Sequence, residues 1–263
     1  MTYDTIAAHL GDHPWLDRIT VLDTVDSTNT RAKALAVQGA PHGTVILSDH
    51  QTGGRGRLGR SFSSPKGKGV YLSVIFRYAV PPEQLMHSTC VVAEAARRAV
   101  LDAGGVRADI KWINDLVCGK KKLCGILTEL VTTADGFALI CGIGVNCSQL
   151  PEDFPPDVAP MATSLLQLTG RADRAAVAAA LIHQLHLASL DLITNPAAWM
   201  QPYKAHCITL WQDVQLLQNN TVRLAHVDDM DDRGALLVTL ADGTKETIFS
   251  GEVSVRGMYG YIT

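Results

Sequence analysis

Apolar and polar positions alternate along residues 1–205 in a way that predicts six strands. These strands are expected at residues 19–22, 44–48, 70–76, 110–113, 123–131 and 137–145. The run 70–76 is apolar on both faces, which favours a central strand of a sheet. Ala134-Asp135-Gly136 separates the last two runs and is typical of a tight hairpin.

Helical segments lie between and after these strands. Asp26-Ser27-Thr28 offers capping side chains for a helix over 30–37 that stops at Gly39. Pro81-Pro82-Glu83 is expected to open a long amphipathic helix that ends at Gly104-Gly105. Three more helices are expected at residues 163–168, 174–192 and 196–203. This mixture predicts an α+β fold, with a mixed β-sheet and flanking helices.

The pattern changes near Ala205, where short strands punctuated by turns replace the longer elements. The strands are expected at 214–217, 221–227, 235–240, 244–249 and 253–255. Asp232-Arg233-Gly234 and Ala241-Asp242-Gly243 mark tight connections between them. Short strands at this spacing indicate a small closed β-barrel. We therefore expect two domains, residues 1–205 and residues 206–263.

Composition narrows the class of protein. The 263 residues are 47% hydrophobic, enough to bury a large core, and the net charge is −3. No apolar run reaches the roughly 18 residues that span a bilayer, and the first ten residues lack the pattern of a secretory signal. The six cysteines are spaced too irregularly for a zinc site. We expect buried, reduced thiols in a cytoplasmic protein with no membrane partner.

The segment from Gly53 to Arg60 is the most informative in the chain. Its sequence, Gly-Gly-Arg-Gly-Arg-Leu-Gly-Arg, holds four glycines and three arginines. Glycines let a backbone approach a ligand closely, and guanidinium groups suit phosphate and carboxylate oxygens. The segment is therefore a candidate clamp for a phosphorylated or carboxylate ligand. A solvated surface loop and an RNA-binding Arg/Gly segment are the alternatives, although the net charge argues against the second.

Two polar segments follow predicted strands. In Asp26-Ser27-Thr28-Asn29, the side chains could cap a helix or bind a polar head group, and capping alone is the favoured interpretation. In Gly142-Ile143-Gly144-Val145-Asn146, the glycines permit close approach by another backbone or a flat ring. Neither segment identifies a ligand by itself.

Lys111-Trp112-Ile113-Asn114-Asp115-Leu116 is the third segment with chemical meaning. On a strand, Lys111 and Ile113 would share one face, and Trp112 and Asn114 the other. A lysine that points into a sheet-lined pocket is costly unless it meets an anion. Asp115 at the end of the strand could bind a metal or orient a lysine. The alternative is a turn at a strand end with solvated lysines beyond it.

In this order, the segments resemble one family closely, the biotin protein ligases. The resemblance covers Asp26–Asn29, Gln51–Arg60, Lys111–Leu116, Lys122–Glu129 and Gly142–Asn146, and it extends into the segments 234–238 and 250–254. It thus spans most of the chain. It implies a fold like that of class II aminoacyl-tRNA synthetases and biotin ligases, followed by a small SH3-like β-barrel.

The resemblance also implies a reaction in two steps. ATP and biotin would form biotinyl-5′-AMP with release of pyrophosphate, because a free carboxylate is a poor acyl donor. A lysine of the biotin carboxyl carrier protein would then attack the acyl carbon, and AMP would leave. The first step brings two anions together, which explains a loop dense in arginine and a lysine in the pocket. Mg²⁺ on the phosphates would offset the remaining charge.

The resemblance assigns a role to each matching residue. It places Ser27, Thr28, Asn29 and Gln51 around biotin, and Arg55, Gly56 and Arg57 over biotin and the adenylate. It places Arg60 near phosphate, Phe62 (where many relatives have Trp) on adenine, and Lys111 at the carboxylate and acyl phosphate. It places Gly125, Gly142, Gly144 and Asn146 along the floor and back of the pocket, and it counts Gly54 and Asn114 among the substrate-binding residues. Lys111, Asp115, Lys122 and Arg57 are the expected catalytic residues, with Asp115 also near the metal. Ile113 replaces the proline that is usual between Trp and Asn.

The expected partner is the biotin carboxyl carrier protein. About 25 residues precede Asp26, which is too few for a helix-turn-helix domain of the usual kind, so we expect the ligase-only form and no DNA partner. The sequence leaves open whether two subunits pair. A lipoate or octanoate ligase of related fold is the second candidate, although such relatives lack the Arg/Gly loop. A non-catalytic biotin sensor would need neither Lys111 nor the arginines.

Overall fold

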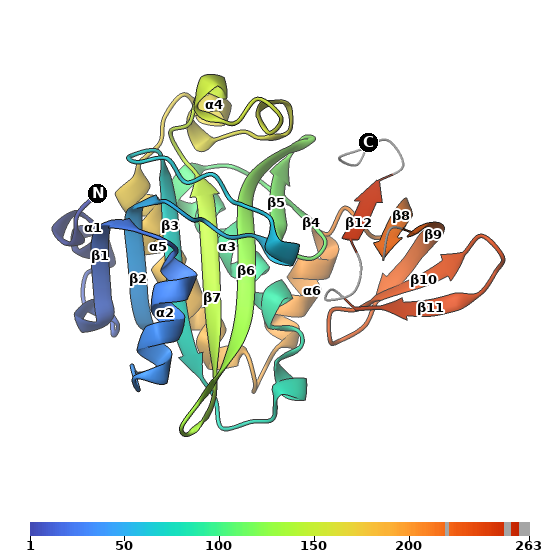
Figure 1. Cartoon of the computed structure of the whole chain (residues 1–263), viewed down its shortest axis with the longest axis horizontal. Coiled ribbons are helices and arrows are strands. Elements are labelled where there is room, and N and C mark those ends of the chain that lie inside the picture. Colours follow the sequence, from blue (N-terminus) through green and yellow to red (C-terminus); the bar gives the residue numbers. More distant parts are fainter. Residues whose placement is uncertain (219–220, 250–253, 258–263) are drawn as a thin grey trace.

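The computed structural model describes residues 1–218, 221–249 and 254–257, and it contains two β-sheets (Figure 1). The larger sheet has seven strands in the order β1-β2-β3-β7-β6-β5-β4. Their bounds are β1 Ile19–Val25, β2 Thr44–Gln51, β3 Gly69–Arg77, β4 Asp109–Lys111, β5 Asp115–Cys118, β6 Lys121–Thr133 and β7 Gly136–Asn146. β1 and β2 are parallel and the other neighbours antiparallel, so the predicted mixed sheet is confirmed.

Helices flank both faces of this sheet. They are α1 Tyr3–Leu10, α2 Thr28–Val37, α3 Ser88–Gly104, α4 Leu165–Thr169, α5 Arg174–Asp191 and α6 Ala197–Ala205. Short 3₁₀ turns lie at Leu16–Arg18, Arg57–Gly59, Pro82–Leu85, Pro151–Asp153 and Ala159–Met161. α3 and α5 pack together behind the sheet, whereas α2 lies on the opposite face (Figure 1). The face that carries α2 is therefore only partly covered by helices.

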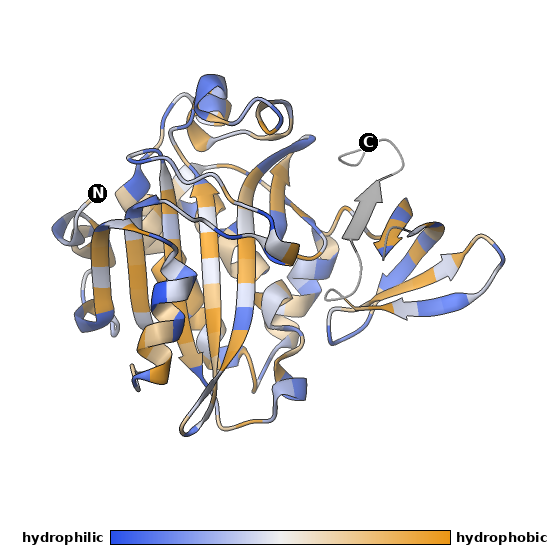
Figure 2. Ribbon diagram, viewed as in Figure 1, coloured by the Kyte–Doolittle hydropathy of each residue, from blue (hydrophilic) through white to orange (hydrophobic). Residues whose placement is uncertain are grey.

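β3 is buried along almost its whole length, because α2 and α5 pack against it and β2 and β7 lie on either side of it. Every residue from Gly69 to Phe76 is buried, which confirms the prediction of a central strand. The hydropathy view shows apolar residues concentrated on the inner strands of the larger sheet (Figure 2). A second, smaller apolar cluster under α2 contains Ala32, Ala36, Ile46, Ile75, Ala138 and Ile140.

Three local predictions were wrong. The long helix begins at Ser88 and not at the prolines, because Pro82–Leu85 forms a separate 3₁₀ turn. β4 ends at Lys111 and residues 112–114 form a turn, so residues 110–113 do not alternate as a strand would. Asp115 does not end a strand but begins β5, where it is paired with Lys111. The helix α1 and the strand β5 were not predicted.

The second sheet is antiparallel and follows the order β11-β10-β9-β8-β12. The bounds are β8 Asp213–Gln218, β9 Thr221–Met230, β10 Leu236–Leu240, β11 Lys245–Ile248 and β12 Ser254–Gly257. This arrangement confirms a small C-terminal β unit after the larger sheet; the predicted strand residue Val253 and most of the segment 250–254 lie outside the described residues.

The two sheets meet at Trp112. Its indole Nε1 donates a hydrogen bond to the Gly234 carbonyl at 2.9 Å, and its backbone N–H donates to Thr209 Oγ1 at 3.0 Å. A Cβ on Gly234 would lie 2.7 Å from Cys90 Sγ, and Gly234 has φ of +84°. Only glycine fits that turn without strain. The C-terminal unit is thus packed directly against the segment that follows β4.

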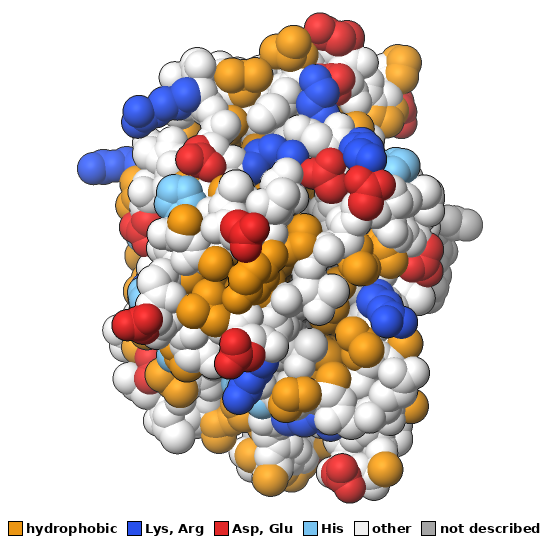
Figure 3. All heavy atoms as spheres, turned by 90° about the vertical axis from the view of Figure 1, so that its left-hand side faces the viewer, with side chains coloured by type: hydrophobic (Ala, Val, Ile, Leu, Met, Phe, Trp, Pro, Cys, Tyr) orange, Lys and Arg blue, Asp and Glu red, His pale blue; other side chains and the backbone are white. Residues whose placement is uncertain are grey.

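The side of the molecule that carries α1 and β1 shows hydrophobic side chains gathered near its middle, with charged side chains at the margins (Figure 3). None of the helices among the described residues is long and apolar enough to cross a membrane. All six cysteines are free thiols, five of them buried, as predicted. Burial raises the pKa of Cys147 to about 12 and that of Cys118 to about 11, so both are protonated at neutral pH.

Candidate active site

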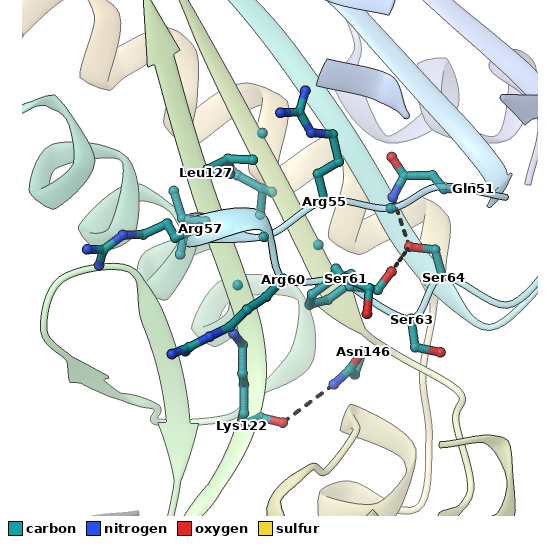
Figure 4. Close-up of a pocket in the computed structure, with 18 of the residues that line it drawn as sticks. Gln51, Arg55, Arg57, Arg60, Ser61, Ser63, Ser64, Lys122, Leu127 and Asn146 are labelled. Atoms are coloured by element: carbon teal, nitrogen blue, oxygen red, sulfur yellow. Dashed lines mark hydrogen bonds between the residues drawn. The ribbon is translucent and has the colours of Figure 1, made fainter. Parts of the chain in front are cut away.

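A cavity of about 840 Å³ lies between the larger sheet and the Arg/Gly segment, which crosses in front of β6 and β7 (Figure 4). We call residues 53–62 the flap. Every residue that the sequence suggested for the site lines this cavity: Ser27, Thr28, Asn29, Gln51, Gly54, Arg55, Gly56, Arg57, Arg60, Phe62, Lys111, Asn114, Asp115, Lys122, Gly125, Gly142, Gly144 and Asn146. Segments separated by more than 100 residues therefore meet in one place.

Glycines form the floor of the cavity. Gly125 of β6 is paired with Gly144 of β7, so two residues without side chains lie next to each other. A Cβ on Gly144 would lie 2.5 Å from the Phe62 ring, and one on Gly142 would lie 2.1 Å from Asn29 Oδ1. The sheet is consequently bare where the flap and α2 approach it closest.

Uncharged polar side chains line the end of the cavity next to α2. Gln51 Oε1 accepts hydrogen bonds from the Thr28 N–H at 2.8 Å and from Thr28 Oγ1 at 3.1 Å. Gln51 Nε2 donates to Ser64 Oγ at 2.8 Å. Ser73 Oγ lies 2.6 Å from Asn29 Oδ1 and 2.8 Å from Thr28 Oγ1. This network fixes the positions of several neutral donors and acceptors.

Capping of α2 differs from the favoured prediction. Ser27 occupies the N-cap position, but its side chain makes no capping hydrogen bond. Gln51, which comes from β2, instead accepts from the first helical N–H, at Thr28. Ser27 is one of the residues that line the cavity.

The flap is a small hairpin held by its own backbone. The Gly56 N–H donates to the Arg60 carbonyl at 2.7 Å, and the Phe62 N–H donates to the Gly54 carbonyl at 2.9 Å. Leu58 at the tip has φ of +55°, and its side chain is 60% exposed. The side chains of Arg55, Arg57 and Arg60 leave the flap in different directions (Figure 4). The hairpin thus presents its guanidinium groups to more than one part of its surroundings.

Positive charge gathers at the other end of the cavity. Lys111 is almost fully buried, and Lys122 Nζ lies 2.7 Å from Asp115 Oδ1. Arg57 Nη1 donates to Asn114 Oδ1 at 3.2 Å, and Asn114 in turn exchanges hydrogen bonds with the backbone of Ile126. Burial lowers the pKa of Arg57, against the attraction of Asp115. A guanidinium group still keeps its proton at any physiological pH.

Phe62 connects the flap to the floor. Lys122 Nζ lies 5.8 Å from the centre of the Phe62 ring, and the ring lies over Gly125 and Gly144. The aromatic ring therefore lies close to the glycines and within reach of a cation, which suits an aromatic or cationic neighbour. Lys122 also contributes its backbone carbonyl, which accepts a hydrogen bond from Asn146 Nδ2 at 3.4 Å.

Sequence analysis missed several cavity residues. Ser64 lines the cavity and supports Gln51, while the fully buried Ser73 supports Asn29 from beneath. A serine facing a polar motif from a neighbouring strand has no local signal. Residues of the connection after β7 also line the cavity: Phe154, Pro155, Val158, Met161 and Ala162. Glu129 could have been found, because it lies two and four residues beyond Leu127 and Gly125 and so shares their face of β6.

The residues that could hold a metal ion are few. Asp115 is the single carboxylate that lines the main cavity among the described residues, and its oxygen is paired with Lys122. The described part of the chain contains no group of three or more His, Cys, Asp or Glu side chains with metal-binding geometry. Such a site does not fit a cage made by the protein. It fits a metal that takes most of its ligands from phosphates and water.

This fold and cavity fall within a recognised class. The model of the Biotin/lipoate A/B protein ligase family matches residues 21–146, and the model of the Biotin protein ligase C terminal domain matches residues 212–256. The first match contains the large sheet from β1 to β7 and nearly the whole cavity. The second contains the C-terminal sheet. The class is therefore that of the biotin and lipoate protein ligases.

Individual relatives narrow this class. The biotin–[acetyl-CoA-carboxylase] ligase of Mycobacterium tuberculosis is 31% identical over 246 residues, 90% of this chain and 88% of that protein. The bifunctional ligase/repressor BirA of Bacillus subtilis is 34% identical over 243 residues, 89% of this chain and 72% of that protein. The Aquifex aeolicus biotin protein ligase, solved in complex with biotin and ATP, superposes with a TM-score of 0.77 at 28% identity, covering 91% of this chain and 99% of that one. The chain belongs to the biotin protein ligase family.

Proposed function

We propose that the protein activates biotin with ATP and transfers it to a lysine of a biotin carboxyl carrier protein. One observation carries the proposal: a single cavity joins a neutral polar end to a strongly cationic end beneath one flap. Biotin has the same polarity, with a neutral ureido head, an apolar chain and a carboxylate. The family to which the chain belongs supports the same conclusion.

The neutral end suits the ureido head. A cyclic urea needs donors for its carbonyl oxygen and acceptors for its two N–H groups. Thr28, Asn29, Gln51 and Ser64 supply both kinds of group, already held in place by one another. Groups fixed before binding lose little conformational freedom when the ligand arrives. The bare floor at Gly142 and Gly144 leaves room for the flat bicycle and its chain.

The cationic end suits the first chemical step. A biotin carboxylate oxygen attacks the α-phosphorus of ATP, the bond to the bridging oxygen breaks, and pyrophosphate leaves with its electron pair. Lys111, Arg57, Arg60 and Lys122 surround this end of the cavity. Their charges would offset the repulsion between the two anions and the charge that develops on the transferred phosphorus. Lys111 is the candidate for direct contact with the acyl phosphate.

The flap is placed to protect the product of the first step, biotinyl-5′-AMP, from hydrolysis. A mixed anhydride of a carboxylic acid and AMP hydrolyses readily, so water must be kept from it. Residues 53–62 cross the open face of the sheet, and Arg57 ties the flap to Asn114 on the far side. Phe62 would lie against the adenine ring. We propose that the flap closes over the adenylate until the carrier arrives.

In the second step the lysine amine of the carrier attacks the acyl carbon, and AMP leaves as the bond between the acyl carbon and the phosphate oxygen breaks. The attacking amine must lose a proton. Asp115, the carboxylate lining the main cavity, is our candidate to accept it, with Lys122 holding its orientation at 2.7 Å. The removal of that proton leaves a neutral amide on the carrier.

We also propose that Mg²⁺ enters on the phosphates of ATP, where it would offset their charge. Asp115 could contact it, which would compete with its pairing to Lys122. The proposed compartment is the cytoplasm, which six free thiols suit. The domain division at 205/206, the absence of a DNA partner and the pairing of subunits stay predictions. The second candidate, a lipoate ligase, is disfavoured by the relatives, which are biotin ligases.

The test is a direct comparison of substrates. The purified protein is incubated with ATP, Mg²⁺ and either biotin or lipoate, and a biotin carboxyl carrier domain is then examined by mass spectrometry. We expect the mass of a biotinyl group on one lysine, and pyrophosphate release that requires biotin. Modification by lipoate alone, or no modification with either acid, would contradict the proposal.

A further inference from the structure

Glu129 of β6 lies where the neutral end of the cavity meets the flap. It shares a face of the strand with Leu127 and Gly125, and its side chain is 19% exposed. It also lines a second cavity of about 300 Å³, together with flap residues 55–59. Arg55 and Arg57 line both cavities, so the two cavities adjoin at the flap. None of the roles assigned above involves Glu129.

The two oxygens of Glu129 have different partners. Oε2 accepts a hydrogen bond from Asn29 Nδ2 at 2.9 Å. Oε1 forms an ion pair with Lys33 Nζ at 2.5 Å, and Arg55 Nη2 lies 3.7 Å from the same oxygen. Lys33 belongs to α2, whereas Arg55 belongs to the flap. One carboxylate thus connects the ureido-binding end, the helix and the flap.

The electrostatics agree with this picture. Burial raises the pKa of Glu129, but the hydrogen bonds from Lys33 and Asn29, together with the charges of Lys33 and Arg55, outweigh that effect and hold the pKa below its ordinary value. The carboxylate is therefore ionised at neutral pH and can attract a cation. Lys33, at the shorter distance, leaves Arg55 outside hydrogen-bond range of Oε1.

We propose that Glu129 is a positioning residue that latches the flap to the ureido-binding end, and that Lys33 limits the strength of the latch by competing with Arg55. The inference rests on the proposed function, since the flap is the cover of the adenylate. Asn29 fixes the orientation of the carboxylate from one side, while the two cations share it on the other. Movement of Asn29 on ligand binding would thus shift the Glu129 carboxylate and change its distance to Arg55.

Because Lys33 and Arg55 compete for the same oxygen, substitutions of Glu129 and of Lys33 should change the frequency of flap opening in opposite directions. Glu129→Gln removes the charge that attracts Arg55 but keeps the shape and an oxygen for Asn29, so the flap should open more often. Lys33→Met keeps the length of the side chain but removes the competing cation, so Oε1 becomes available to Arg55 and the flap should open less often. If Glu129 only supported α2, both variants would weaken the same ion pair and change the enzyme in the same direction.

The experiment measures escape of the activated biotin. Wild type and variants receive biotin and Mg·ATP in the presence of serum albumin, and biotin on albumin lysines is quantified by mass spectrometry. We expect about a two- to fivefold rise for Glu129→Gln and a comparable fall for Lys33→Met, the range that a partly exposed ion pair supports. Both effects should shrink between 50 mM and about 500 mM salt, because screening weakens the pair.

A matched control is Glu246→Gln, which removes the carboxylate paired with Arg223 in the C-terminal sheet at 2.7 Å, outside both cavities. Its albumin labelling should equal that of wild type. Changes in the same direction for Glu129→Gln and Lys33→Met, or no change in either, would overturn the latch. A wild-type protein without biotin-dependent pyrophosphate exchange would instead refute the proposed function, so the two failures can be told apart.

Discussion

Gly142 offers the sharpest test of how the floor is built. In Gly142→Ala the new Cβ would lie 2.1 Å from Asn29 Oδ1 and 2.7 Å from Asn29 Cγ. Both separations are far below normal contact distances, so the asparagine has to move. Asn29 makes hydrogen bonds to Ser73, to the Leu127 carbonyl and to Glu129, at 2.6, 3.2 and 2.9 Å. A displaced side chain cannot keep all three.

The cost follows from these contacts. Each hydrogen bond in such a network contributes about 1 kcal/mol net, and a buried group left unsatisfied costs about 1–3 kcal/mol. Loss of two bonds thus predicts that Gly142→Ala lowers the free energy of unfolding by about 2–3 kcal/mol. If Asn29 contacts the ureido group, biotin binding loses about 1.4 kcal/mol or more, which is about tenfold in Kd.

Urea denaturation measures the first effect, and titration calorimetry with biotin measures the second. The control is a double-mutant cycle with Asn29→Ala, which removes the atom that the new methyl group strikes. In that background Gly142→Ala should cost less than about 0.5 kcal/mol, within the usual error of additivity. An equal loss of stability in both backgrounds would show that the clash with Asn29 is not the cause.

Three other predictions follow from the site and the fold. Lys111→Ala should abolish biotin-dependent pyrophosphate exchange while the circular dichroism spectrum stays unchanged, because in the proposed mechanism this buried lysine offsets charge at the reacting anions. Arg57→Gly should release the flap from Asn114, so that activated biotin labels albumin as well as the carrier domain. His13→Asn should make stability less sensitive to acid. Burial, with repulsion from His186 and His183, lowers the pKa of His13 to about 4, so His13 stabilises the fold above pH 6.5 and this contribution is lost as the pH falls toward 4. At pH 5 the loss is about 2 kcal/mol in wild type, and urea denaturation at pH 7.5 and 5.0 should show it absent in the variant.

A specific result would contradict each of these three predictions. Exchange at the wild-type rate in Lys111→Ala would remove the lysine from the first step. Labelling confined to the carrier in Arg57→Gly would count against the role of the flap as a seal. Asparagine keeps an oxygen near the position of His13 Nδ1, which accepts the Trp15 N–H at 3.2 Å. An unchanged acid sensitivity in His13→Asn would therefore mean that other groups, and not this imidazole, titrate on unfolding.

Much of the fold could be predicted from local patterns. The burial of β3, the hairpin between β6 and β7 and the change to short strands after Ala205 each depend on residues that are close in sequence. The residues of the cavity could be predicted because each stands in a short segment with an unusual composition. Local pattern is enough when one strand or one loop carries the whole signal.

The errors arise where distant residues decide the local structure. β4 stops at Lys111 because Trp112 is held by Thr209 and Gly234, which lie about a hundred residues further on. The α2 cap comes from Gln51 on another strand, so the motif at Ser27 could not reveal it. Glu129 shares a face of β6 with Leu127 and Gly125, but its partners Asn29 and Arg55 come from distant segments that fold against it, so its contacts could not be predicted from sequence.

The hydrogen bond from Trp112 to Gly234 joins positions 122 residues apart, and Trp112 is the immediate neighbour of Lys111. The C-terminal unit therefore supports the segment that carries Lys111, although none of its residues lines the main cavity in the described part of the chain. We expect a substitution at Gly234, which is buried in the turn against Cys90, to displace Trp112 although it lies outside the main cavity. A shortened protein should therefore retain both sheets if the segment around Lys111 is to keep its position.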